Sequence, residues 1–270
     1  MSLRVGIGIV ALFGLVALCA PYLTRHGPKT DVGVAYLPPG PGHPLGTDDQ
    51  GYDLWSQLLH GSRPAFAVGA GAMAVTMAIA VTVALCATLL AGRADRILMT
   101  AGDILISLPH LPLLLLVGIL IGPSVPGTIA LIAIVGWVVP AREIRARALA
   151  IRQSGYVRAA RGFGAGTRYL MARHLIPALG PVLASVAVAQ FGRAISLEAG
   201  LAFLGVGDVT RTSWGLTIRQ ALDDASLWFT GRWLWWPLPP GLAIAGLLLA
   251  CALLGAGLET RLDPRLRERR

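Results

Sequence analysis

Charged residues are scarce in this sequence. They make up only 14% of its 270 residues, whereas 55% are hydrophobic, and the mean hydropathy is +0.66. Soluble globular domains contain roughly 25% charged residues, so this composition excludes an ordinary soluble domain. The chain is instead expected to lie in a membrane.

Cysteine pairs, nucleotide-binding loops and internal repeats are also missing. Cys19, Cys86 and Cys251 lie in separate apolar runs without C-x-x-C spacing, and we expect small buried hydrophobes rather than disulfide partners or metal ligands. Without a G-x-x-x-x-G-K-[ST] loop, any ATP that drives this protein must bind another chain. The apolar runs hold few ionisable groups and no H-E-x-x-H motif, which argues against an intramembrane enzyme. The absence of an internal repeat gives no support to an inverted-repeat carrier, although a stand-alone secondary transporter remains an alternative.

Six long apolar runs dominate what is present. They cover approximately Val5–Leu23, Ala65–Ala91, Ile104–Gly122, Pro126–Ala141, Ala178–Val206 and Leu238–Leu258. About 20 apolar residues span a bilayer as a helix, and a helix satisfies its own backbone hydrogen bonds in lipid. The sequence therefore predicts an all-α polytopic membrane protein with about six transmembrane helices. The first run lacks a small-residue cleavage site, so it is expected to be a retained helix rather than a signal peptide.

Basic residues gather on one side of the predicted membrane. Sixteen of the 23 Lys and Arg residues lie on the side that holds the N-terminus, mainly in residues 142–173 and in the C-terminal tail. By the positive-inside rule, both termini and this stretch are expected to be cytoplasmic. The formal net charge of +9 is thus explained by topology, and nucleic acid is not an expected partner.

Two connecting segments are predicted on the opposite, outer side. Residues 24–64 are rich in Pro, Gly and Asp, which predicts turns, with Asp53 capping a short surface helix over 54–61. His43 and His60 lie near aspartates here, but the turn-forming neighbours of His43 argue against a metal site.

The second outer segment, residues 207–237, carries the tripeptide SWG at 213–215 and an aromatic cluster. The cluster comprises Trp228, Phe229, Trp233, Trp235 and Trp236. Aromatic residues at the end of an apolar run are typical of the membrane interface, with a docking surface for a soluble partner as the alternative.

The inner side has one brief predicted loop, residues 92–103, and one long one. In the long loop, the fourth helix is expected to continue over 141–153. A helix over 157–161, a glycine turn and a helix over 169–174 follow, and Pro177 then begins the fifth span.

This long basic loop has two interpretations. It can hold the topology and contact anionic lipid. Small residues at Ala159 and Ala160 and a tight glycine bend favour instead a rigid protrusion that transmits motion from a soluble partner.

The spacing of the loop residues resembles a known motif. Ala159-Ala160, Gly164 and His174-Leu175-Ile176-Pro177 resemble the E-A-A…G…I-x-L-P loop of bacterial ABC importer permeases. Arg158 stands in the place of the motif's glutamate, and Ile176 in the place of its leucine. Further stretches in the same order resemble permeases for dipeptides, oligopeptides and nickel, of the second, C-type, subunit. These stretches are HPLGTDDQGYDLWSQLLHGSR (43–63), DILISLP (103–109), AREIR (141–145), EAGLAFLGVG (198–207), SWG and LDPRLR (262–267).

The resemblance implies a fold, a function and a set of partners. It implies the type I ABC importer permease fold, in a multi-pass protein of the bacterial cytoplasmic (inner) membrane that forms the path for peptides, or alternatively for nickel or a metal chelate. It implies no catalysis and no cofactor in this chain, with ATP and Mg bound by partner subunits. The partners would be a second homologous permease, two ATP-binding subunits and an extracytoplasmic substrate-binding protein. The expected parts are an N-terminal helix (1–23), an extracytoplasmic segment (24–64), a permease core (65–262) that contains the cytoplasmic coupling loop (142–177), and a cytoplasmic tail (263–270).

Two groups of residues are the candidate functional ones. The resemblance assigns ATPase docking to Tyr156, Val157, Arg158, Ala159, Ala160, Gly164, His174 and Pro177. Arg193 and Glu198 are candidates for the solute path, because ionisable residues inside a span are costly and usually functional. Their five-residue spacing turns them about 140° apart on a helix, so they are expected to face different neighbours. The alternatives are a structural pairing for Glu198 and an ion pair with the partner permease for Arg193.

Overall fold

The computed structural model is built from helices and connecting segments. Within the residues that it describes, 2–90, 92–208 and 210–262, there is no β-strand. In this described part of the chain, four helices are long and apolar enough to cross a membrane, and up to six spans result if each of two bent helix pairs counts as one. The predictions of an all-α protein and of about six spans are therefore confirmed.

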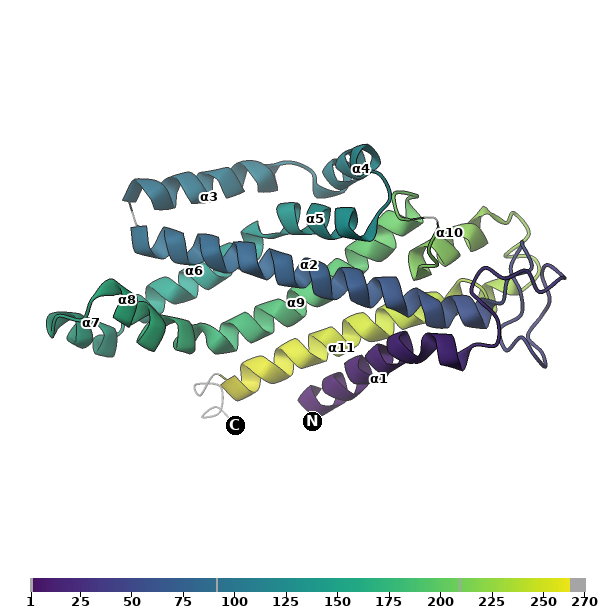
Figure 1. Ribbon diagram of the computed structural model, residues 1–270, viewed down its shortest axis with the longest axis horizontal. Coiled ribbons are helices and arrows are strands. Elements are labelled where there is room, and N and C mark those ends of the chain that lie inside the picture. Colours follow the sequence, from purple (N-terminus) through teal and green to yellow (C-terminus); the bar gives the residue numbers. More distant parts are fainter. Residues whose placement is uncertain (1, 91, 209, 263–270) are drawn as a thin grey trace.

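Four long helices run along the length of the molecule (Figure 1): α1 (Ser2–Leu23), α2 (Leu54–Leu90), α9 (Ile176–Phe203) and α11 (Leu238–Leu262). Most of the buried positions of α2 are Ala, Gly, Ser or Thr. Between α1 and α11, a Cβ on Gly257 would come within 2.7 Å of the Leu3 side chain. Small residues let helix backbones approach closely, which is how helices pack where lipid removes the hydrophobic drive between them.

Two bent pairs complete the bundle. Helix α3 (Gly92–Ser107) meets α4 (His110–Ile121) at 89°, and α5 (Val125–Gly136) meets α6 (Val138–Arg152) at 48°. Prolines explain both breaks.

The first break corrects two expectations. Residues 92–103 are helical rather than a loop, and the predicted third run over 104–122 is divided between α3 and α4. Pro109 has no N–H to continue α3 and restricts the residue before it, so the chain turns there. At the second break, Pro140 cannot donate to the Gly136 carbonyl four residues back, which ends α5.

The two ends of the bundle differ. Helices α7 (Gly155–Gly162) and α8 (Thr167–Leu170) project at one end, and the start of α1 and the last turns of α11 point toward that end (Figure 1). We call this the inner end. Residues 24–53 and α10 (Trp214–Asp223) gather at the other, outer, end. The predicted tail, residues 263–270, and all but the first residue of LDPRLR lie outside the described residues.

The outer segment is held to α2 by buried polar contacts. Residues 24–53 fold back on themselves through isolated β-bridges. Asp48 is fully buried and accepts hydrogen bonds from Gln57 Nε2 (2.5 Å) and from two backbone N–H groups (2.8 and 2.9 Å). Asp53 caps α2 by accepting from the Ser56 N–H at 3.1 Å, which confirms its predicted role.

The surface helix predicted over 54–61 is not a separate element. It forms the first turns of α2, which continues through Pro64 into the span. Leu54 is buried in a cluster with Leu227 and Trp236. The apolar side of this stretch therefore faces protein rather than the membrane surface.

Trp236 and Cys19 also depart from the sequence expectations. Trp236 is only 1% exposed and meets Tyr36 edge-on at 6.0 Å, so it belongs to the core of the outer end rather than to an interface belt. Trp228 and Phe229 of the same cluster are exposed. Cys19, expected to be buried, is exposed, because much of the surface of α1 is not covered by the rest of the chain.

Candidate functional site

The inner end carries a helical hairpin, residues 155–175, in which α7 and α8 are joined by a glycine turn. Gly164 has φ +85°, a conformation that favours glycine. The Gly164 N–H donates to the Arg161 carbonyl (3.0 Å) and the Ala165 N–H to the Ala160 carbonyl (3.1 Å). This pair of bonds is the Schellman ending of a helix. The predicted helix, glycine turn and helix are confirmed.

The hairpin is anchored to the bundle from one side. Val157, Leu170 and Leu175 are at most 5% exposed and point inward. The His174 ring packs between Tyr156 and Tyr169, with centroid distances of 5.8 and 5.7 Å. After a π-helical turn over Met171–Leu175, Pro177 lies in the first turn of α9, as predicted.

The other side of the hairpin is open. Tyr156, Arg158, Ala159 and Gly164 are exposed, while Ala160 is half-buried and Val157 belongs to the anchor. Phe163, which sequence reasoning missed, is 93% exposed. The sequence feature that could have identified Phe163 is its position directly before the turn glycine, because the side chain at this end of the helix points outward.

The hairpin directly follows α6, a helix that polar contacts hold to α3 and α2. Arg145 of α6 donates to both carboxylate oxygens of Asp95 on α3, at 2.6 and 2.5 Å. Arg142 pairs with Asp103 of α3, and the Arg152 guanidinium donates to the Thr88 carbonyl of α2. The bidentate Arg145–Asp95 pair adds a fixed geometry to the attraction between the charges.

The acidic partners in these pairs were not found by sequence reasoning. Asp95 and Asp103 lie within the stretch expected to be a short loop, and only the helix α3 brings them beside α6. The number of basic residues on this side predicts the topology, and some of these residues also form structural ion pairs.

The two candidate path residues lie on different sides of α9, as their spacing predicts. Glu198 is 6% exposed and faces the interior of the chain. Arg193 is exposed, on the same side of the helix as the exposed residues Ala189 and Ser196. Arg193 has no ion-pair partner among the described residues.

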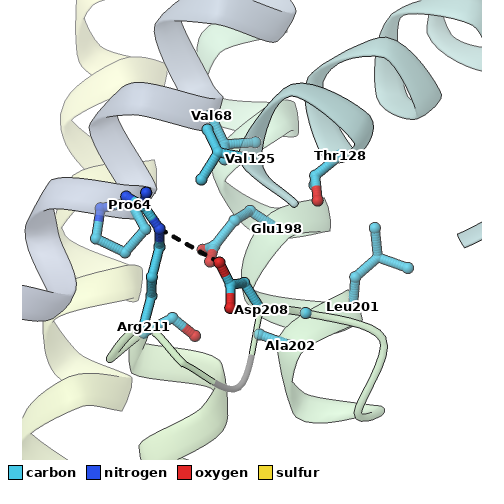
Figure 2. Close-up of a pocket in the computed structure, with 11 residues that line it drawn as sticks. Pro64, Val68, Val125, Thr128, Glu198, Leu201, Ala202, Asp208 and Arg211 are labelled. Atoms are coloured by element: carbon cyan, nitrogen blue, oxygen red, sulfur yellow. Dashed lines mark ion pairs between the residues drawn. The ribbon is translucent and has the colours of Figure 1, made fainter. Parts of the chain in front are cut away.

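Glu198 lines a small pocket near the outer end of α9 (Figure 2). The pocket has room of about 20 Å³ and is walled by α2, α5, α9 and the segment after α9. Oε2 of Glu198 is buried and has no hydrogen-bond partner among the residues that the structure describes. Asp208 and Arg211 line the same pocket, and Arg211 Nε lies 3.3 Å from the Asp208 carboxylate.

Asp208 is held as a carboxylate. Its Oδ1 accepts from the Thr210 hydroxyl at 2.5 Å and from the Thr210 N–H at 3.0 Å. The hydroxyl bond, followed by the backbone bond and the charge of Arg211, holds the pKa of Asp208 below its ordinary value. One negatively charged group and one buried carboxyl oxygen without a donor therefore share this pocket.

The SWG tripeptide joins three helices at the outer end. Ser213 caps α10 by accepting from the Leu216 N–H (3.2 Å), and Trp214 Nε1 donates to the Leu58 carbonyl of α2 (2.8 Å). A Cβ on Gly215 would lie 2.0 Å from the Ala199 carbonyl oxygen, so only glycine allows α10 to lie this close to α9. The tripeptide is explained by packing.

The outer histidines make local contacts. His43 Nδ1 lies 3.3 Å from Asp53 Oδ1, and its ring stacks on His26. His60 Nδ1 lies 3.0 Å from the Ser56 carbonyl oxygen. Among the residues that the structure describes, no group of three or more His, Cys, Asp or Glu side chains is placed to hold a metal ion.

Known proteins similar to this chain agree on one family. A family model described as "Binding-protein-dependent transport system inner membrane component" matches residues 74–268, which include the hairpin and both candidate path residues. A putative peptide transport system permease protein of Brucella suis biovar 1 (strain 1330) is 36% identical over 271 residues, covering 98% of this chain and 88% of the relative. The probable D,D-dipeptide transport system permease protein DdpC of Escherichia coli (strain K12) is 33% identical over 259 residues, covering 95% and 85%.

Proposed function

This chain belongs to the family of binding-protein-dependent transport system inner membrane components, and from that membership we propose that it is a permease subunit of an ATP-driven importer of peptides. The family consists of membrane permeases rather than enzymes. The choice of solute follows relatives named for peptide and D,D-dipeptide transport. The chain would form part of the path, while partner subunits hydrolyse ATP.

The observation that carries this proposal is the inner hairpin. It projects beyond the bundle (Figure 1), presents Tyr156, Ala159 and Phe163 outward, and is mounted on α6, which the Asp95 pair ties to α3. A stiff element with an open apolar side suits a groove on an ATP-binding subunit. Closure of such subunits would then push the hairpin and, through α6 and α9, reorient the spans. Arg158, which replaces the glutamate of the resembled motif, is exposed on the hairpin and would meet an acidic group of its ATPase.

The proposed assembly contains this chain, a second homologous permease, two ATP-binding subunits and an extracytoplasmic binding protein. The inner end and both termini would lie in the cytoplasm, and the binding protein would deliver its solute to the outer end. Charge placement supports this orientation.

Arg193 would line the path beside the second permease. A guanidinium in contact with lipid is expensive, so the exposed side of α9 around Arg193 requires either water or protein against it. An aqueous path formed between two permeases would supply that environment. Glu198 would then lie at the outer entrance of the same path.

The hairpin is tested by changing its turn. In proteoliposomes with the complete importer, Gly164→Val forces a β-branched residue into φ +85°, at a cost on the order of 1–3 kcal/mol. We expect peptide uptake driven by ATP to fall about tenfold or more while the two permeases remain associated. Gly166→Ala is the control, because Gly166 has φ −70° and no atom within 4 Å of an added Cβ.

Two results would contradict the proposal. One is full uptake by the Gly164→Val importer at equal membrane abundance. The other is gradient-driven uptake by this chain alone, without ATPase subunits, which would make it a secondary carrier.

A further inference from the structure

A cationic cavity lies at the outer end of the bundle. It has a volume of about 590 Å³, within the range of roughly 300–1,000 Å³ of small-molecule sites. Lys29, Arg63 and Arg211 line it, and no acidic side chain does so among the described residues. They are three of the six basic residues expected on the outer side, and the other three are Arg25, Arg219 and Arg232.

Three separate segments build this cavity. Lys29 lies in a turn closed by a hydrogen bond from the Thr30 N–H to the Gly27 carbonyl (3.1 Å). Arg63 projects from α2, is exposed, and has no acidic partner within the described part of the chain. Arg211 comes from the segment between α9 and α10. Their convergence therefore depends on the tertiary structure rather than on a local run of basic residues.

The cavity adjoins the Glu198 pocket. Pro64 and Arg211 line both spaces, and Figure 2 shows Arg211 on one side of the pocket with Glu198 and Asp208 opposite. The pocket, at about 20 Å³, holds one water-sized group, because such a group needs roughly 10–15 Å³. Among the described residues, none donates a hydrogen bond to the buried Oε2 of Glu198, and a buried carboxylate without a partner is costly.

We propose that the outer cavity and the Glu198 pocket together form an entry site for an unblocked peptide, whose carboxylate lies among Lys29, Arg63 and Arg211 and whose ammonium group donates to Glu198. The inference rests on the proposed function, since it assigns the two ends of a peptide to two charged regions of this chain. An ammonium group has the size of a water molecule and supplies the missing donor. Guanidinium groups bind carboxylates through charge-assisted hydrogen bonds.

The site is tested with the complete importer in proteoliposomes, supplied with saturating binding protein that carries one of three solutes. The solutes are a free dipeptide, its C-terminal amide and its N-acetyl derivative. Uptake by each variant is divided by wild-type uptake of the same solute, which removes the selectivity of the binding protein itself. Arg63→Gln, Arg63→Lys and Glu198→Gln are compared with Arg25→Gln, an exposed outer arginine that lines neither space.

We expect Arg63→Gln to lower uptake of the free dipeptide about tenfold and to leave the amide unchanged, because the amide has no charge for Arg63 to bind. Arg63→Lys restores most of the difference. Glu198→Gln lowers uptake of the free dipeptide but not of the N-acetyl derivative. Arg25→Gln changes none of the three.

Other outcomes overturn the site. Equal loss of all three solutes in Arg63→Gln means that the cavity docks the binding protein. Unchanged ratios in Glu198→Gln mean that Glu198 is a neutral acid with a structural role. If the wild-type importer takes up no peptide at all, the proposed function itself fails, which is a separate result.

Discussion

At the scale of single residues, the ionisable side chains inside the spans most need a structural explanation, because charge is costly within a membrane. Glu198 and Arg193 share α9, but Glu198 is enclosed by other helices of the same chain, whereas Arg193 faces outward. A guanidinium near the middle of a span requires water or a partner against it. Arg193 is exposed and has no ion-pair partner within the described part of the chain, so the assembled importer must supply water or a partner group for its guanidinium.

Arg193 is predicted to contribute to solute selection. Arg193→Ala should weaken apparent affinity for peptides with a free carboxylate about tenfold, because a charge-assisted contact is lost, and Arg193→Lys should retain part of it. The measurement is concentration-dependent uptake at equal membrane abundance. Ser196→Ala, on the same side of α9, is the control. Unchanged affinity and selectivity in both arginine variants would show that Arg193 does not read the solute.

The sequence was sufficient to predict the roles of residues that depend only on their neighbours in the chain. The cap at Asp53, the turn at Gly164 and the different directions of Arg193 and Glu198 all follow from backbone geometry within one element. It did not predict the Asp95 partner of Arg145, because the two are 50 positions apart and meet only after α3 and α6 have packed.

At the scale of helices, the placement of glycine and proline decides which elements touch and where they bend. Pro64 and Pro181 lie inside α2 and α9, which continue through them, while Pro109 stands where α3 gives way to α4. A proline is tolerated in a span when neighbouring groups satisfy the freed carbonyl. A proline in an apolar run therefore does not by itself distinguish a break from a continuous helix. For this reason the sequence did not predict the division between α3 and α4.

Gly215 is predicted to control the packing of α10 on α9. In Gly215→Ala, the new Cβ would lie 2.0 Å from a backbone oxygen, which cannot rotate away, so α10 must move. We expect the free energy of unfolding to fall by about 1–3 kcal/mol. The unfolding temperature in detergent, measured by tryptophan fluorescence, should fall with it. Gly241→Ala in α11, with no atom within 4 Å of the added Cβ, should not lower it. A wild-type unfolding temperature for Gly215→Ala would show that the two helices are not held this closely.

At the scale of the whole molecule, the two ends have different charge and different construction. The inner end presents a basic hairpin next to helices joined by ion pairs, and the outer end is formed by folded loops and α10 (Figure 1). The cationic cavity lies among these outer segments. Apolar runs and the count of basic residues were enough to predict this polarity, because both are properties of composition along the chain. The outer cavity was not predictable, since its lining comes from three segments far apart in sequence.

The orientation of the molecule gives the last prediction. The hairpin stretch 155–173 carries four arginines and no acidic residue, and moving each charge outward against the membrane potential costs about 2.3 kcal/mol per 100 mV. In a background with the three native cysteines replaced by alanine, Gln50→Cys should react with an impermeant maleimide in spheroplasts. Phe163→Cys should react only after permeabilisation. Both positions are exposed, so both should label fully in detergent, and fast labelling of Phe163→Cys in intact spheroplasts would reverse the proposed orientation and remove the hairpin from any cytoplasmic ATPase.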